Sequence, residues 1–223
     1  MERIAEHHGL NTLDHVLRQL EARLPRVPEL ADHRPLVADR RAGVKTAREA
    51  WDEAREARLA ASAELLYLDE EVDRALIDAG QTLYLQVGRD RNAPAYRKLF
   101  PVSPTQMGAD LGSDRQDRWV TGVIDDVRTD GAYAALRPMA DALAGHLDRL
   151  RAARARREEL YVKEAQARAA LLTVADDARR FYNGLYHRFM TALPDRPRLV
   201  ESLFPKLTAT ADPAPAPEAD PVA

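Results

Sequence analysis

The sequence contains no cysteine, and this absence excludes several kinds of site at once. Without thiols the chain can form no disulfides, no cysteine-ligated zinc site, no iron–sulfur cluster and no thiolate nucleophile. Glycine is also scarce, at 10 of 223 residues. The GxGxxG and GxxxxGK[ST] patterns that bind phosphates do not occur, and neither does the GxSxG pattern of a nucleophile elbow. The sequence therefore gives no support to a nucleotide-binding loop or to serine hydrolase chemistry.

Long apolar runs are missing as well. No segment approaches the ~18 consecutive apolar residues that a membrane-spanning helix needs. The first residues carry charges and no apolar stretch, unlike a secretory signal. We therefore expect a cytoplasmic protein with no membrane partner.

The charges are nearly balanced, with 33 basic and 36 acidic residues, a net charge of −3 and a pI near 6.1. Most nucleic-acid-binding proteins have a basic excess, which this chain lacks. Hydrophobic residues make up 45% of the chain and charged residues 31%, a composition typical of a folded protein.

The histidines do not follow a metal-binding pattern. Carboxylate-bridged metal sites in helical bundles use Glu three residues before His, because residues three apart share a helix face. None of the six histidines has an acidic residue at that position, and no two are four residues apart. We predict no metal and no cofactor. The acidic clusters at 69–71 and 176–177 are interpreted as solvated helix faces.

Proline is absent from two stretches, between Pro35 and Pro94 and between Pro138 and Pro194, and both are rich in good helix formers. Apolar residues recur there at steps of three and four, which predicts one buried stripe on each helix. The first stripe comprises Leu65, Leu68, Val72, Leu76, Ala79, Leu83 and Val87. The second comprises Leu171, Val174, Ala178, Phe181, Leu185 and Phe189. We predict two helices of roughly 53 to 56 residues that begin near the first proline of each stretch, the first ending near Gly88.

These patterns predict an all-α fold, an elongated helical bundle with two long antiparallel helices that pack through the two stripes as in a coiled coil. The motif Leu99-Phe100-Pro101 recurs 104 residues later at 203–205, which indicates a duplicated helical hairpin unit. We assign residues 1–104 to the first unit, 105–207 to the second, and expect both to pack as one bundle. Residues 208–223 are rich in alanine and proline and are predicted to form a disordered tail.

Aromatic residues gather toward the end of each predicted unit. Buried aromatic rings usually fill the core, and we expect the phenylalanine of each Leu-Phe-Pro motif to pack back on its long helix. Exposed tyrosines beside it would form a partner site. The candidate partner surface comprises Tyr84, Tyr96, Phe100, Tyr182, Tyr186 and Phe204.

A run of arginines is the best candidate for phosphate contacts. It comprises Arg149, Arg151, Arg154, Arg156 and Arg157. At about 100° per residue these side chains spread around the helix instead of forming one stripe. The competing interpretation is surface ion pairing, with the acidic residues at 52, 53 and 56 of the other long helix as candidate partners.

No motif identifies a known family. The leading hypothesis is a non-catalytic interaction or scaffold protein that binds a protein partner or itself, because no set of polar residues converges on a reacting atom. The first alternative is a nucleic-acid- or phosphate-binding module that uses the arginine run. The second is a helical-bundle enzyme without a recognisable motif. No residue is predicted to be catalytic.

Overall fold

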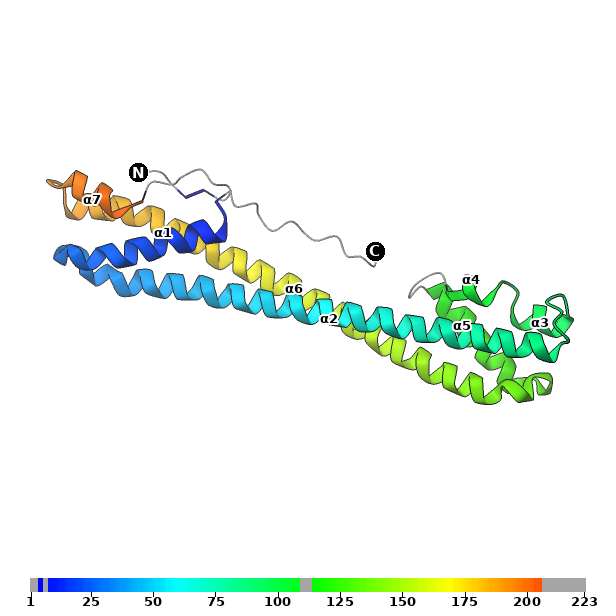
Figure 1. Ribbon diagram of the computed structural model, residues 1–223. Coiled ribbons are helices and arrows are strands. Elements are labelled where there is room, and N and C mark those ends of the chain that lie inside the picture. Colours follow the sequence, from blue (N-terminus) through cyan, green and yellow to red (C-terminus); the bar gives the residue numbers. More distant parts are fainter. Residues whose placement is uncertain (1–3, 6–7, 109–113, 206–223) are drawn as a thin grey trace. The chain divides into compact units, whose positions relative to one another are not determined.

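The computed structural model describes residues 4–5, 8–108 and 114–205, and it contains helices and no strands within these ranges (Figure 1). The protein is an all-α bundle, as predicted. Its chain divides into two compact units. Among the described residues, unit 1 joins those up to Arg55 to residues 163–205, and unit 2 consists of residues 56–108 and 114–162.

Two long helices supply most of both units, and short helices pack beside them. The α-helices are α1 (Leu10–Arg23), α2 (Arg34–Gln86), α3 (Pro94–Leu99), α4 (Pro104–Gly108), α5 (Asp114–Thr129), α6 (Arg137–Ala192) and α7 (Pro197–Leu203). The 3-10 helices are η1 (Leu24–Arg26), η2 (Pro28–His33) and η3 (Gly131–Leu136).

Proline and glycine residues determine where the long helices begin and where α2 ends. Helices α2 and α6 have 53 and 56 residues, and Pro35 and Pro138 are the second residue of each. Proline is tolerated there because the first amide groups of a helix have no intrahelical partner. Beyond α2 the backbone turns left-handed at Gly88, with a φ of 73°, and the amide of Arg89 donates to the carbonyl oxygen of Tyr84. This is the glycine-assisted helix ending that the sequence predicts.

In unit 1, α1 and α7 cover the first part of α2 and the last part of α6 (Figure 1). Leu13, Leu17 and Leu20 of α1 are fully buried, because they recur on one face of the helix. They share a core with Ala178 and Leu185 of α6. Unit 1 is thus a bundle in its own right.

In unit 2, the last part of α2 packs antiparallel to the first part of α6, with α3, α4 and α5 beside them (Figure 1). Val72 and Leu76 of α2 are fully buried, and they share a core with Leu143 and Leu147 of α6. Helix α5 adds Val120 and three further apolar side chains. Unit 2 therefore has a separate core.

The prediction that the two apolar stripes pack against each other is wrong. The stripe on α2 lies in the core of unit 2, whereas the stripe on α6 lies in the core of unit 1. The reason is the antiparallel direction, which pairs the end of one helix with the beginning of the other. Residues 65–83 therefore face residues 140–153, whose own apolar spacing forms the other half of that core.

The compact units do not coincide with the sequence halves 1–104 and 105–207, because each unit takes one part from either half. Apart from η1 and α4, which have no counterpart in the second half, the order of elements recurs: α1, η2, α2 and α3 in the first half correspond to α5, η3, α6 and α7 in the second. Pro94 at the start of α3 and Pro197 at the start of α7 are 103 residues apart. Duplication of a helical unit remains a prediction. The tail at 208–223 lies outside the described residues.

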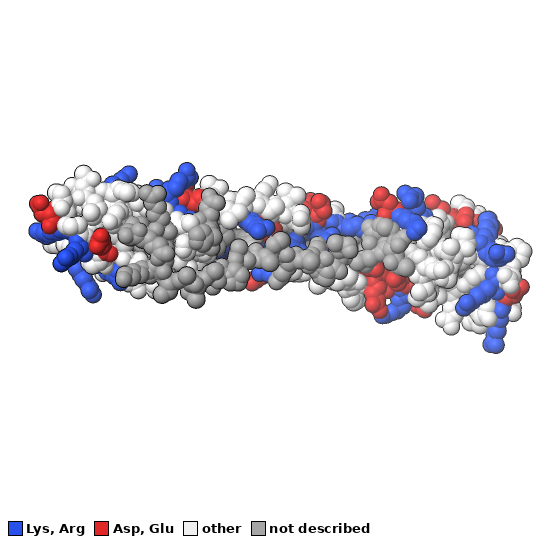
Figure 2. All heavy atoms as spheres, turned by 90° about the horizontal axis from the view of Figure 1, so that it is seen from above, with Lys and Arg blue, Asp and Glu red and all other residues white. Residues whose placement is uncertain are grey.

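Within the described ranges, none of the helices combines the length and the apolar character that a membrane crossing requires. On the face that Figure 2 presents, basic and acidic side chains are intermixed.

Candidate functional site

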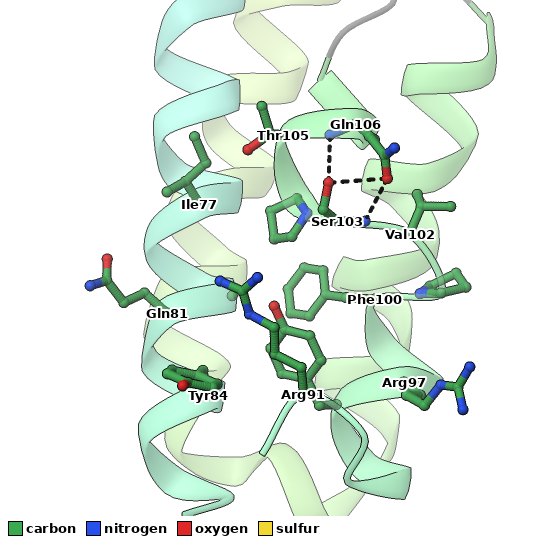
Figure 3. Close-up of a pocket in the computed structure, with 14 residues that line it drawn as sticks. Ile77, Gln81, Tyr84, Arg91, Arg97, Phe100, Val102, Ser103, Thr105 and Gln106 are labelled. Atoms are coloured by element: carbon green, nitrogen blue, oxygen red, sulfur yellow. Dashed lines mark hydrogen bonds between the residues drawn. The ribbon is translucent and has the colours of Figure 1, made fainter. Parts of the chain in front are cut away.

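A pocket of about 750 Å³ opens on unit 2, where the end of α2 meets the segment that carries α3 and α4 (Figure 3). Helix α2 contributes Ile77, Gln81 and Tyr84 to its lining. The segment beyond α2 contributes Arg91, α3 contributes Tyr96, and further residues follow up to Gln106. The pocket therefore forms where the chain leaves the long helix and folds back against it.

Aromatic rings form one side of the pocket. The ring centroids of Tyr84 and Tyr96 are 6.4 Å apart, with their planes at 73°. Those of Tyr96 and Phe100 are 5.5 Å apart and tilted by 43°. Both separations lie in the range of favourable aromatic pairs. Tyr96 and Phe100 belong mainly to the core, with 7% and 4% of their surface exposed, whereas Tyr84 is half-buried.

Two arginines supply the positive charge of the pocket. The guanidinium of Arg91 lies 5.5 Å from the ring centroid of Tyr84, a cation–π contact. Figure 3 shows this guanidinium between α2 and the ring of Phe100, whereas Arg97 extends outward at the rim. Both arginines are exposed, and within the described part of the chain neither forms an ion pair. The pocket lining, which consists of described residues, includes no Asp, Glu, His or Lys.

A capping box borders the pocket at the start of α4. Ser103 precedes α4; its Oγ accepts a hydrogen bond from the amide of Gln106 at 3.2 Å. The Oε1 of Gln106 in turn accepts from the amide and the hydroxyl of Ser103, at 3.2 and 3.1 Å (Figure 3). These reciprocal bonds satisfy the free amides at the start of a helix. The motif Ser-Pro-Thr-Gln at 103–106 shows this pattern, although the sequence analysis did not identify it.

Glycine allows α4 to approach α2 closely. A Cβ atom at Gly80 would lie 2.5 Å from Cγ of Pro104, and one at Gly108 would lie 1.9 Å from Oδ1 of Asp73. Both distances are too short for real atoms, so the position of α4, and with it one wall of the pocket, depends on two residues without side chains.

A buried acidic group lies at the same contact between α2 and α4. Asp69 is only 7% exposed and accepts a hydrogen bond of 2.8 Å from the fully buried amide of Gln116 on α5. Oδ1 of Asp73 is buried and has no hydrogen-bond partner among the described residues. Burial, together with the negative charges of Asp69 and Glu70, raises the pKa of Asp73 to about 6, although a hydrogen bond from Gln116 lowers it in part.

The acidic cluster at 69–71 is therefore not the solvated face that the sequence predicts. Asp69 lies in the interior, and Glu71 is the centre of a surface network that includes Tyr67, His146 and Arg149. The hydroxyl of Tyr67 donates to Glu71 at 2.8 Å, and the carboxylate lies 2.9 Å from Arg149 and 3.1 Å from His146. The hydrogen bond from Tyr67 and the neighbouring His146 and Arg149 hold the pKa of Glu71 below its usual value.

The arginine run contacts carboxylates of unit 2. Arg149 pairs with Glu71 at 2.9 Å, and Arg156 pairs with Glu64 at 3.5 Å. Arg151 makes a bidentate contact with Asp117 of α5, in which Nε donates to Oδ1 and Nη2 donates to Oδ2, both at 2.7 Å. This contact holds the pKa of the Asp117 carboxyl below its usual value. Arg154 has two buried guanidinium nitrogens without a hydrogen-bond partner among the described residues, and Nε of Arg157 donates to the hydroxyl of Ser62 at 3.3 Å.

Surface ion pairing thus occurs, but with partners other than the acidic residues at 52, 53 and 56. The antiparallel register places residues 149–157 opposite 62–71, about two to four turns beyond the expected partner at position 56. Phosphate binding by these arginines remains a prediction. A phosphate would have to compete with carboxylates that already neutralise three of them.

The candidate partner surface is divided between the two units. Tyr84, Tyr96 and Phe100 line the pocket of unit 2, whereas the other three residues belong to unit 1. Tyr182 and Phe204 are buried there, with 1% and 6% exposed. The ring of Phe204 lies 5.3 Å from Tyr182 and 5.4 Å from Tyr186, so Tyr182 and Phe204 fill the core and Tyr186 is half-buried at its edge.

Sequence reasoning found the aromatic side of the pocket and missed its charged side. Arg91 and Arg97 lie in an irregular segment and a short helix, where no periodic pattern indicates the direction of a side chain. Among the described residues, no group of three or more potential metal ligands comes together. Comparisons with models of protein families, with curated proteins and with solved structures found no match to this chain.

Proposed function

We propose that the protein is a non-catalytic interaction module that binds an acidic peptide segment of a partner protein in the pocket of unit 2. The observation that carries the proposal is Arg91, a cation without a carboxylate partner held over Tyr84 inside an aromatic pocket. An incoming carboxylate would supply the missing counter-charge. Apolar side chains of the same segment would cover the rings of Tyr84, Tyr96 and Phe100.

The composition of the lining favours binding over catalysis. General acid–base chemistry needs a group that gains and loses a proton near neutral pH, such as histidine or a perturbed carboxyl. The lining residues offer tyrosine, serine, threonine, glutamine and arginine as their polar groups. The hydroxyl of Ser103 is engaged with Gln106 and has no base beside it within the described lining. Such groups orient and hold a ligand.

Fluorescence anisotropy with the full chain tests the proposal. The probes are labelled synthetic peptides of equal length that combine Asp or Glu with Leu, Tyr or Pro, and matched peptides with Asn and Gln in place of the acids. We expect the acidic peptides to bind more tightly than the neutral ones, and their affinity to fall as salt is raised. Equal binding of both sets would refute the proposal.

Variants locate the binding. Arg91→Ala should weaken binding of the acidic peptides by about tenfold or more, since a charge-assisted hydrogen bond contributes about 1.5–3 kcal/mol. Arg97→Ala should have a smaller effect, mainly on the association rate, because this residue lies at the rim. Arg118→Ala is the matched control: this exposed arginine of α5 lies outside the pocket lining and should leave binding unchanged. Equal losses in Arg91→Ala and Arg118→Ala would contradict the assignment of the pocket.

A further inference from the structure

We propose that residues 208–223 of this chain, presented by a second copy, are a ligand of the pocket in unit 2. This inference rests on the function proposed above and names the peptide. The segment carries Asp212, Glu218 and Asp220 and no basic residue, and it includes four prolines. It therefore has the charge that the pocket lacks and side chains that fit an aromatic surface.

Charge complementarity is the first argument. The pocket offers Arg91 and Arg97 without carboxylate partners among the described residues. Some other arginines of unit 2 are already paired, for example Arg128 with Asp141 at 2.8 Å and Arg151 with Asp117 at 2.7 Å. An acidic segment gains most where the cation is not yet neutralised, because it displaces no existing ion pair.

The spacing of the segment is the second argument. Aromatic-lined grooves bind proline-rich peptides in the polyproline II conformation, which has three residues per turn. A peptide bound in this way would present Asp212, Pro215, Glu218 and Pro221 along one edge, so that acids and prolines alternate. Such a peptide offers acids to Arg91, whose guanidinium lies 5.5 Å from the ring centroid of Tyr84, and prolines to the neighbouring rings of Tyr96 and Phe100. Proline also limits the conformational entropy that binding removes.

The arrangement has a consequence for self-association. A pocket on one copy and a segment on another are different surfaces, so the contact is heterologous. The same contact can then be made again by the next copy. We therefore expect association that increases with protein concentration and decreases with salt.

The receptor for the test is the full chain with the acids of the segment neutralised, D212N, E218Q and D220N together, so that the segments of other copies do not compete with the peptide. A labelled peptide with the sequence of residues 208–223 is titrated against it. We expect saturable binding that Arg91→Ala weakens at least about tenfold and that Arg118→Ala leaves unchanged. A peptide with the same three acids neutralised should bind at least about tenfold more weakly.

The outcomes separate this inference from the proposed function. If the synthetic acidic peptides bind at Arg91 but the 208–223 peptide does not, this inference is wrong and the proposed function stands. If neither binds, both are wrong. Sedimentation adds an independent readout: the mass of the unaltered chain should rise with concentration, and that of the neutralised variant should not. A monomer at concentrations well above the peptide dissociation constant would overturn the assignment to a second copy.

Discussion

Replacing Asp73 with asparagine should stabilise unit 2 at neutral pH and remove part of its pH dependence. Oδ1 of Asp73 is buried against Gly108 of α4 and has no hydrogen-bond partner among the described residues. The neighbouring groups that act on its pKa are the carboxyls of Asp69 and Glu70 on α2 and the amide of Gln116 on α5. No cation contributes to its pKa, so only the hydrogen bond from Gln116 offsets the charge when Asp73 ionises.

The sign follows from the direction of the pKa change. Burial raises the pKa of Asp73 from its ordinary value of 3.8 to about 6, so the folded state binds the proton more tightly than the unfolded state. Stability is therefore lost as the pH rises from about 4 to about 6 and stays low above that range. Each pH unit between the two pKa values lowers the free energy of unfolding by ~1.4 kcal/mol, so the full loss is about 3 kcal/mol. Partial exposure of the Asp73 side chain reduces this loss to about 2 kcal/mol.

Urea unfolding of Asp73→Asn and the parent chain at about pH 4 and about pH 7.5 measures this effect. Each unit has its own tryptophan, Trp51 in unit 1 and Trp119 in unit 2, so a Trp51→Phe background reports on unit 2. We expect Asp73→Asn to match its parent near pH 4 and to exceed it by about 2 kcal/mol near pH 7.5.

Asp78→Asn is the control, because this residue is an exposed aspartate of the same helix. It should leave the pH dependence of unit 2 unchanged. Two results would refute the reasoning. One is a stability difference between Asp73→Asn and its parent that is the same at both pH values, and the other is an Asp73→Asn variant that is less stable than its parent near pH 7.5.

Two further predictions concern packing. Gly80→Ala should destabilise unit 2 by about 1–3 kcal/mol and weaken peptide binding, because its Cβ would lie 2.5 Å from Pro104. Gly122→Ala in α5, whose Cβ meets nothing within 4 Å, should instead stabilise unit 2 by about 0.5–1 kcal/mol in urea unfolding, and equal effects of the two substitutions would contradict this account. Phe204→Ala should cost unit 1 about 4 kcal/mol, and Phe100→Ala should cost unit 2 about 3 kcal/mol, because Phe100 borders a pocket. Trp51 and Trp119 fluorescence compares the two losses, and a larger loss at Phe100 would count against the argument.

The sequence was sufficient to predict the helices because helix formation leaves local signals. Apolar spacing of three and four residues identified Leu76 and Leu185 as buried, and both are. Proline and glycine marked where α2 and α6 begin and where α2 ends. The partner of each helix segment was not predictable in this way, since antiparallel pairing depends on contacts between residues far apart in the chain, such as Glu71 and Arg149, which are 78 positions apart.

The burial of polar groups was the property that was hardest to predict from the sequence. Asp69 follows Leu68 in an acidic run and has the local sequence of an exposed face. It is buried because Gln116, 47 residues away, donates to its carboxylate and satisfies it. The position of Arg91 was not predictable from the local sequence either. Its contact with Tyr84 depends on how the chain turns at Gly88 and Arg89, whose φ angles are 73° and 66°.

The duplication predicted from the sequence aligns the two aromatic clusters, and they differ at one informative position. The offset of 102 residues that aligns Tyr84 with Tyr186 also aligns Gly80 with Tyr182. In unit 1 the ring of Tyr182 is buried against Phe204. In unit 2 glycine leaves that space to Pro104, and the pocket opens beside Phe100. The aligned position therefore has a buried ring in unit 1 and no side chain in unit 2, beside the pocket. We place the binding function in unit 2 because Arg91 lies in that pocket without a carboxylate partner among the described residues.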